Sequence, residues 1–212
     1  ALQLYGTDEG TTKRLNEYSM GYQGDPEWMG YESTAIISSR NGLIRAETGV
    51  ELPERLKPAI PDDRNRLMIV DEKLYRVSES DSYMEPVSPF DDPEAKILNL
   101  VHSPDGKFVA FERYGEGLYL MNSNGDNLRF LGKAYRPSWS PDSRYLVAME
   151  TQDNGYTFTA AELVVFGTDS LSRVEITTKT DLITLNPSWS PYGDSILFND
   201  PETGHVYLLP LR

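Results

Sequence analysis

Short apolar runs, each bounded by turn-forming residues, follow one another along most of this chain. Clear examples cover residues 108–111, 145–149 and 196–198. Runs of this length, rich in β-branched and aromatic residues, are typical of buried β-strands. No long stretch has the apolar period and the caps of a helix. The pattern therefore predicts an all-β fold.

A turn motif precedes these strands and makes the chain repetitive. Trp-Ser-Pro occurs at Trp139 and at Trp189, and a third copy begins with histidine, at His102. Two weaker copies begin at Pro26 and Pro61, and residues 26–38 align without gaps on residues 137–149. Proline and aspartate favour tight turns. Each copy therefore predicts two strands joined by a tight turn.

A second predicted hairpin follows the motif in several copies. In the third copy it joins residues 118–121 to residues 128–131 through an Asn- and Gly-rich turn, and similar patterns occur near residues 73–77 and 163–176. Four strands per unit, at intervals of about 40 residues, are typical of β-propeller blades. We predict a β-propeller of four-stranded blades, with five blades favoured and six as the alternative.

The predicted units lie near residues 16–56, 57–93, 94–132, 133–179 and 180–212 of one domain. The last unit ends after a third strand, whereas residues 1–15 have the pattern of a second hairpin. We expect residues 1–15 to supply the missing strand and to close the ring. If a strand is left over, it would belong to a sixth, incomplete blade.

The motif Pro-x-Trp-Ser-Pro-Asp, followed by an apolar strand and by Leu-Tyr-Leu-Met-Asn-Ser-Asn-Gly, resembles the WD40-like PD40 repeat of TolB-like β-propellers. The copies at residues 103–131, 136–149 and 186–198 carry the resemblance, over about the C-terminal half of the chain. It implies a bacterial envelope protein that receives a peptide or a small ligand at its central channel. A periplasmic or other extracytoplasmic location is expected, and the lack of cysteine fits an exported protein.

Composition mainly excludes function classes. Without cysteine there are no disulfides, thiol nucleophiles or zinc-finger sites. The only histidines, His102 and His205, are too few for a metal site of three histidines. A net charge of −13 repels phosphate backbones, so we expect no nucleic-acid partner. No apolar run is long enough to cross a membrane. We expect no metal and no cofactor.

The tryptophans and the turn aspartates have structural interpretations. Trp28, Trp139 and Trp189 occur at one position of the repeat, which predicts packing between blades rather than a ligand platform. Asp105 and Asp142 occupy equivalent turns, where aspartate bonds its own backbone. A catalytic carboxylate pair would have to lie within about 10 Å, and we do not expect that of two neighbouring blades.

Two sets of residues are candidates for binding. Polar residues that follow the second strand of each unit are expected at the channel mouth: Arg40, Arg113, Asp153 and Asp200. The segment 78–93 is rich in serine, proline and acidic residues and also holds Tyr83, Met84 and Phe90. Because loops on a rigid scaffold carry recognition, this segment is a candidate recognition element.

The favoured function is a non-catalytic module that binds a protein or peptide partner, with a small ligand or glycan as a further candidate. One alternative is a glycan-active lyase or hydrolase that uses channel carboxylates. It would require acidic and basic residues from several blades to converge. No Gly-x-Ser-x-Gly motif points to serine hydrolase chemistry. Another alternative is a sensor domain of a larger receptor.

Overall fold

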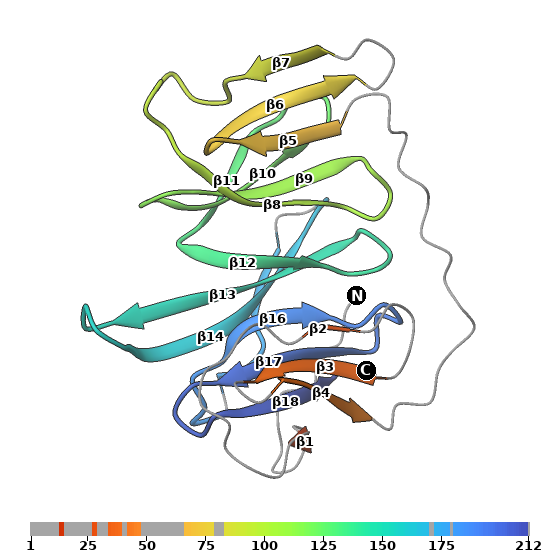
Figure 1. The fold of residues 1–212 in the computed structure, drawn as a ribbon, viewed down its shortest axis with the longest axis vertical. Helices are drawn as coiled ribbons and strands as arrows, with labels where there is room; N and C mark the ends of the chain where they lie inside the picture. Colours follow the sequence, from red (N-terminus) through yellow and green to blue (C-terminus); the bar gives the residue numbers. More distant parts are fainter. Residues whose placement is uncertain are drawn as a thin grey trace.

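The computed structural model describes residues 66–78, 83–169, 172–178 and 180–211, together with the backbone of four short strands nearer the N-terminus. Within this part of the chain all regular structure is β, with eighteen strands in five antiparallel sheets (Figure 1). The all-β prediction is therefore confirmed.

Two of the sheets hold four strands that follow one another in the chain. The first contains β8 (Ile97–His102), β9 (Phe108–Arg113), β10 (Gly117–Asn122) and β11 (Arg129–Gly132). The second contains β12 (Ala134–Trp139), β13 (Tyr145–Asp153), β14 (Phe158–Gly167) and β15 (Arg173–Glu175). In both, each strand pairs with the next one, as the predicted tandem hairpins require.

A third four-stranded sheet joins segments from both ends of the chain. It contains β16 (Leu185–Trp189), β17 (Ser195–Asp200), β18 (His205–Pro210) and β1 (Lys13–Arg14). Lys13 lies opposite Leu208, and Arg14 lies opposite Tyr207. The N-terminal strand thus occupies the outer edge of the last sheet.

Two three-stranded sheets precede these along the chain. One contains β2 (Glu27–Trp28), β3 (Thr34–Ser39) and β4 (Gly42–Glu47), and the other contains β5 (Arg66–Val70), β6 (Lys73–Ser78) and β7 (Tyr83–Val87). β5 runs antiparallel to β8, because Leu67 lies against His102 and Glu72 lies against Ile97. β5 therefore has the direction of a second strand, as expected for the run that follows Pro61.

The turn motif has the same register in four sheets. Trp139 lies opposite Leu146, and Trp189 lies opposite Ile196. Two further pairs have the same separation of seven residues, His102 with Val109 and Trp28 with Ala35. The gapless alignment of residues 26–38 on residues 137–149 is therefore confirmed at the level of strand pairing.

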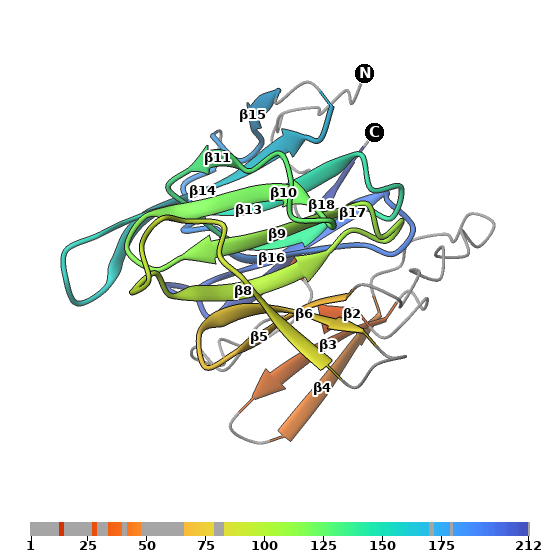
Figure 2. The ribbon, with the colours of Figure 1, turned by 90° about the horizontal axis from the view of Figure 1, so that it is seen from above.

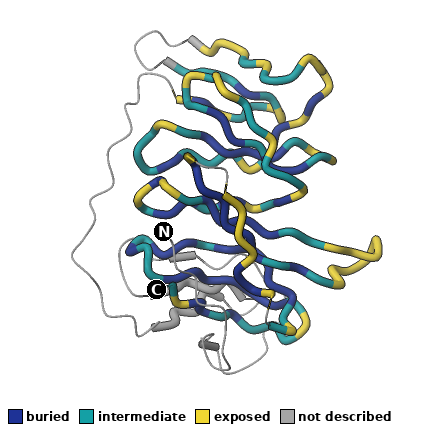
Figure 3. Tube along the Cα trace, turned by 180° about the vertical axis from the view of Figure 1, so that it is seen from behind, coloured by how far each residue is buried: buried dark blue, intermediate teal, exposed yellow. Residues whose placement is uncertain are grey.

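Neighbouring sheets pack face to face, with the strand pairs β5–β8, β8–β12 and β12–β16 in contact (Figures 1 and 2). The apolar residues of alternating strand positions fill the layers between the sheets. Exposed residues gather at the turns and outer edges, as Figure 3 shows. The fully buried side chains include Leu74, Phe111, Leu146, Leu163 and Phe198.

Candidate functional site

Turns between second and third strands gather on one side of the molecule, at the left of Figure 1. They span residues 71–72, 114–116, 154–157 and 201–204, and we call this side the loop face. The connection from β7 to β8, residues 88–96, borders the same side, since the amide of Tyr114 donates to the carbonyl of Lys96 at 2.9 Å. Residues 88–93 of this connection belong to the segment 78–93 that the sequence indicates as a recognition element.

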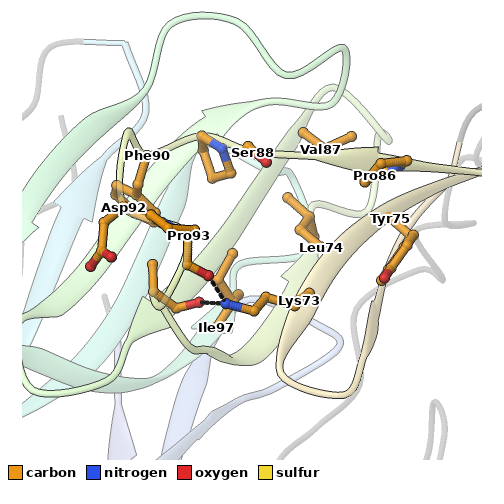
Figure 4. Close-up of a pocket in the computed structure, with 12 residues that line it drawn as sticks. Lys73, Leu74, Tyr75, Pro86, Val87, Ser88, Phe90, Asp92, Pro93 and Ile97 are labelled. Carbon is orange, nitrogen blue, oxygen red and sulfur yellow. Dashed lines mark hydrogen bonds between the residues drawn. The ribbon is translucent and has the colours of Figure 1, made fainter.

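A pocket opens between the sheet β5–β7 and this connection (Figure 4). Its cavity volume is about 120 Å³. Leu74 and Ile97, both buried, close its inner side, and Tyr75 and Phe90 stand in its wall. The other lining residues are Lys73, Pro86, Val87, Ser88, Pro89, Asp92, Pro93 and Ala95. The mixture of apolar walls with a few polar groups is typical of a binding site.

Lys73 and Asp92 fix the shape of the pocket. The Lys73 ammonium donates to the carbonyl of Pro93 and, at 2.8 Å, to that of Ala95. The Asp92 carboxylate accepts from the backbone amide of Glu94 at 2.9 Å. Because these bonds lie within the wall itself, the pocket is preformed.

Arg113 holds the connection 88–96 against the sheet β8–β11. Its guanidinium pairs with Asp92 at 2.7 Å and with Glu116 at 2.8 Å, and it lies 4.6 Å from the centre of the Phe90 ring. Burial lowers the pKa of Arg113, but the carboxylates of Glu116 and Asp92 outweigh burial and raise it. The Phe90 ring also packs edge-on against Tyr119, with centroids 4.9 Å apart. Arg113 thus stabilises the pocket wall.

The other predicted mouth residues lie apart from the pocket. Asp200 is buried, and it accepts from the hydroxyl of Thr203 at 2.8 Å and from the amide of Glu202 at 3.2 Å. Asp153 is exposed and accepts from the amide of Gly155 at 2.8 Å. Each thus organises its own turn. Arg40 lies outside the described residues.

Among Arg113, Asp153 and Asp200, only Asp153 occupies a different position in its strand, because its strand is longer. Counted from the turn motif, Arg113 and Asp200 occupy the same position of their strands. In the sheet between them that position belongs to Glu150, because β13 continues for three more residues to Asp153. Glu150 pairs with Arg173 at 2.7 Å.

The turn aspartates bond their own turns, as predicted. The Asp105 carboxylate accepts from the Ser103 hydroxyl at 2.7 Å and from the Lys107 amide at 3.1 Å. Burial raises the pKa of Asp105, but these hydrogen bonds and the Lys107 charge outweigh it, so that the pKa is lowered. Asp142 makes the same bonds, with Ser140 and Arg144.

Two tryptophans pack between sheets, which confirms their structural role. Trp139 stacks on Phe108 and Trp189 stacks on Tyr145 of the preceding sheet, both with ring centroids 6.4 Å apart. Both indoles are buried. The side chain of Trp28 lies outside the described residues.

Sequence reasoning missed a buried carboxylate between inner strands. The Glu112 side chain is 6% exposed. One of its oxygens accepts from the side-chain amide of Asn99 at 2.8 Å and from the backbone amide of Arg136 at 2.6 Å. Asn99 and Arg136 have positive φ, as has Asn186 at the same position of β16, and each lies where its strand pairing shifts register. A glutamate directly after the apolar run 108–111 was the available signal.

The residues that the structure describes contain no cluster of three or more histidine, aspartate or glutamate side chains that could hold a metal ion. Among the same residues, no helix is long and apolar enough to cross a membrane.

Comparisons with known proteins relate the chain to β-propellers through structure. No family model matches the sequence, and no curated protein matches it. A solved structure from Agrobacterium tumefaciens described as TolB superimposes with a TM-score of 0.53 at 24% identity, over 78% of this chain and 60% of that one. Oligogalacturonate lyase from Vibrio parahaemolyticus gives 0.52 at 16% identity, over 84% and 54%. A puromycin-hydrolyzing peptidase from Mycobacterium tuberculosis gives 0.52 at 14% identity, over 92% and 38%.

These likenesses confirm the resemblance to TolB-like β-propellers at the level of fold. The chain spans 60% of the first of these structures and 54% of the second. At such identities the likeness shows the fold alone, which binding proteins and enzymes share.

Proposed function

We propose that this chain is a TolB-like propeller module without catalytic activity, which binds a protein or peptide partner through its loop face. The observation that carries the proposal is the preformed pocket between the sheet β5–β7 and residues 88–96. Its inner side is apolar and its rim is polar, an arrangement that suits one apolar side chain of a partner.

The bonding of the charged groups supports binding over catalysis. Around the pocket, Lys73, Asp92 and Arg113 bond to the wall that they hold in place. On the same face, Asp200 organises a turn. General acid–base catalysis requires groups that can reach a substrate proton. The hydrogen bonds and ion pairs of Lys73, Asp92, Arg113 and Asp200 stabilise the wall and the turn in which they lie, as in a rigid binding surface.

The same proposal covers the architecture and the location. We place five blades near residues 16–56, 57–93, 94–132, 133–179 and 180–212, with the ring closed through β1. The pairing of β1 with β18 supports closure at that point. We place the protein in the periplasm, as a bacterial envelope protein, since the PD40-like motif and the likeness to TolB support this location.

A thermal-shift screen with peptides from envelope proteins, oligosaccharides and divalent metals tests the proposed function. A ligand that binds only the folded state raises the melting temperature. We expect a saturable shift with a peptide and loss of that shift in Ser88→Trp, because the exposed Ser88 lines the pocket and a tryptophan there would fill it. The matched control is Thr178→Trp, an exposed position outside the pocket.

The enzyme alternative is tested on the same protein. Oligogalacturonate lyase is one of the similar structures, and one structure of this enzyme is in complex with manganese, so oligogalacturonate with and without manganese is the substrate to assay. We expect no turnover. Metal-dependent cleavage, or a peptide shift that Ser88→Trp leaves intact, would contradict the proposed function.

A further inference from the structure

The hairpin β13–β14 extends beyond its sheet as an arm. β13 has nine residues and β14 has ten, whereas β9 and β17 each have six. β12 pairs with β13 only as far as Glu150, and β15 pairs with β14 only over residues 164–166. Residues 151–160, which we call the arm, therefore project past the neighbouring strands at the left of Figure 1. The exposed tip of the arm is visible in Figure 3.

The base of the arm is anchored to the sheet. Ala161 lies opposite Thr151, and its carbonyl accepts from the hydroxyl of Thr184 at 2.9 Å. Glu150, the residue before the arm, is held by the guanidinium of Arg173 at 2.7 Å. A two-stranded ribbon is only marginally stable by itself, so these contacts are what orient the arm.

The tip of the arm is an ordered turn that presents aromatic rings to solvent. The Asn154 side chain accepts from the amides of Tyr156 and Thr157, both at 3.0 Å. Tyr156 is 96% exposed, and Phe158 is 41% exposed. A register shift between Gln152 and Asp153 sets the pairing of Phe158. Tyrosine and phenylalanine offer a large contact area with only two side-chain torsions to fix on binding, which suits them as anchors.

Charge indicates the partner. No lysine or arginine occurs from Tyr145 to Ser172, a stretch that contains Glu150, Asp153, Glu162 and Asp169. The whole chain carries −13. Asp153 is the only charged residue of the arm and is exposed. Glu150, just before the arm, shares the guanidinium of Arg173 with Glu175. Cationic side chains are attracted both to carboxylates and to the faces of aromatic rings.

We propose that the arm is a docking element for a basic, arginine-rich segment of another protein, with Tyr156 and Phe158 as its aromatic anchors and Asp153 as its charge partner. This surface is separate from the pocket at residues 73–97 and does not depend on it.

Binding of a fluorescein-labelled peptide of alternating arginine and serine, followed by fluorescence anisotropy, tests the proposal. We expect Tyr156→Ala to weaken binding about twofold to fivefold, because the ring face is lost, and Tyr156→Phe to retain it. Asp153→Asn keeps the acceptor of the turn and removes the charge, so it should weaken binding more at low salt than at high salt. The acidic peptide, with glutamate in place of arginine, should not bind.

Tyr114→Ala is the matched control, because Tyr114 is 71% exposed on the same face but lies outside the arm. It should bind the peptide as the unmodified protein does, and so should Ser88→Trp. Amide exchange should slow at residues 151–160 when the peptide is added. Equal binding by Tyr156→Ala, equal losses in Tyr156→Ala and Tyr114→Ala, or no binding would overturn the proposal. A dimer in sedimentation that Tyr156→Ala abolishes would also overturn it, since the arm would then pair with a second copy.

Discussion

His102 Nε2 lies 2.9 Å from the carbonyl oxygen of Leu67, across the junction between two sheets. His102 stands at the motif position that tryptophan occupies in the next copy, where Trp139 Nε1 donates to the carbonyl of Val101 at 3.2 Å. A carbonyl oxygen only accepts, so His102 carries its proton on Nε2. Both copies of the motif thus have a hydrogen bond from a ring N–H to a carbonyl of the preceding sheet, although the ring is histidine in one copy and tryptophan in the next.

Burial of His102 makes stability depend on pH. Burial lowers the pKa of His102 below its usual 6.5, Arg66 lowers it further, and the bond to Leu67 opposes them. The unfolded chain therefore binds more protons than the folded one below about pH 6.5. The contribution of the neutral His102 ring to the free energy of unfolding is fully present above that pH. It is lost as the pH falls through the pKa that His102 has in the folded protein. Urea midpoints measured from pH 8 to pH 5 should fall accordingly.

The variant His102→Phe should remove this part of the pH dependence and cost about 1 kcal/mol at pH 8, the worth of one hydrogen bond. His205→Asn, which leaves His102 in place, is the control and should keep the dependence. A native protein whose midpoints follow those of His102→Phe at every pH would contradict the prediction.

The two buried tryptophans should respond differently to substitution. Trp139 Nε1 donates to Val101, whereas Trp189 Nε1 is buried without a hydrogen-bond partner among the described residues. Replacing a bonded donor leaves a buried acceptor unpaired, while removing an unpaired donor relieves a desolvation cost. We expect Trp139→Phe to lower the free energy of unfolding by about 1–2 kcal/mol more than Trp189→Phe does. Equal losses in chemical denaturation would argue against this assignment.

Loss of the Arg113 guanidinium should loosen the pocket wall. Arg113 holds Asp92 and lies on the Phe90 ring, so Arg113→Met removes both contacts from the connection 88–96. We expect amide exchange in residues 88–96 to become about tenfold faster, because local opening needs less free energy. Lys133→Met, an exposed site elsewhere, is the control for the loss of one positive charge. Unchanged amide exchange at residues 88–96 would show that Arg113 does not stabilise this connection.

Local signals in the sequence predict the turns well. The Ser-Pro-Asp motif predicts the bonds of Asp105 and a tight turn between two strands, because these depend on residues that lie close together in the chain. The role of the Trp139 ring follows from the repeat in the same way.

Features that depend on neighbouring sheets were not predictable. Asn99 and Arg136 have positive φ, and both donate hydrogen bonds to Glu112, although they belong to two different sheets. No local sequence pattern shows that residues of two sheets share this carboxylate. The extra length of β13 shifts Asp153 away from the position that Arg113 occupies. The partners of Arg113 depend on the path of residues 88–96, which a single sequence does not reveal.

Deleting residues 1–15 should strongly destabilise the protein. β1 is the outer strand of the last sheet, where Lys13 lies opposite Leu208, so its removal exposes the backbone edge of β18. We expect a loss of about 2 kcal/mol or more in the free energy of unfolding and aggregation through the open edge. Deleting residues 1–11 keeps β1 and is the matched control, which should unfold nearly as the full chain does. If both truncated proteins unfold at the same denaturant concentration as the full chain, β1 does not close the ring, and an open or six-bladed arrangement would account for the repeats better.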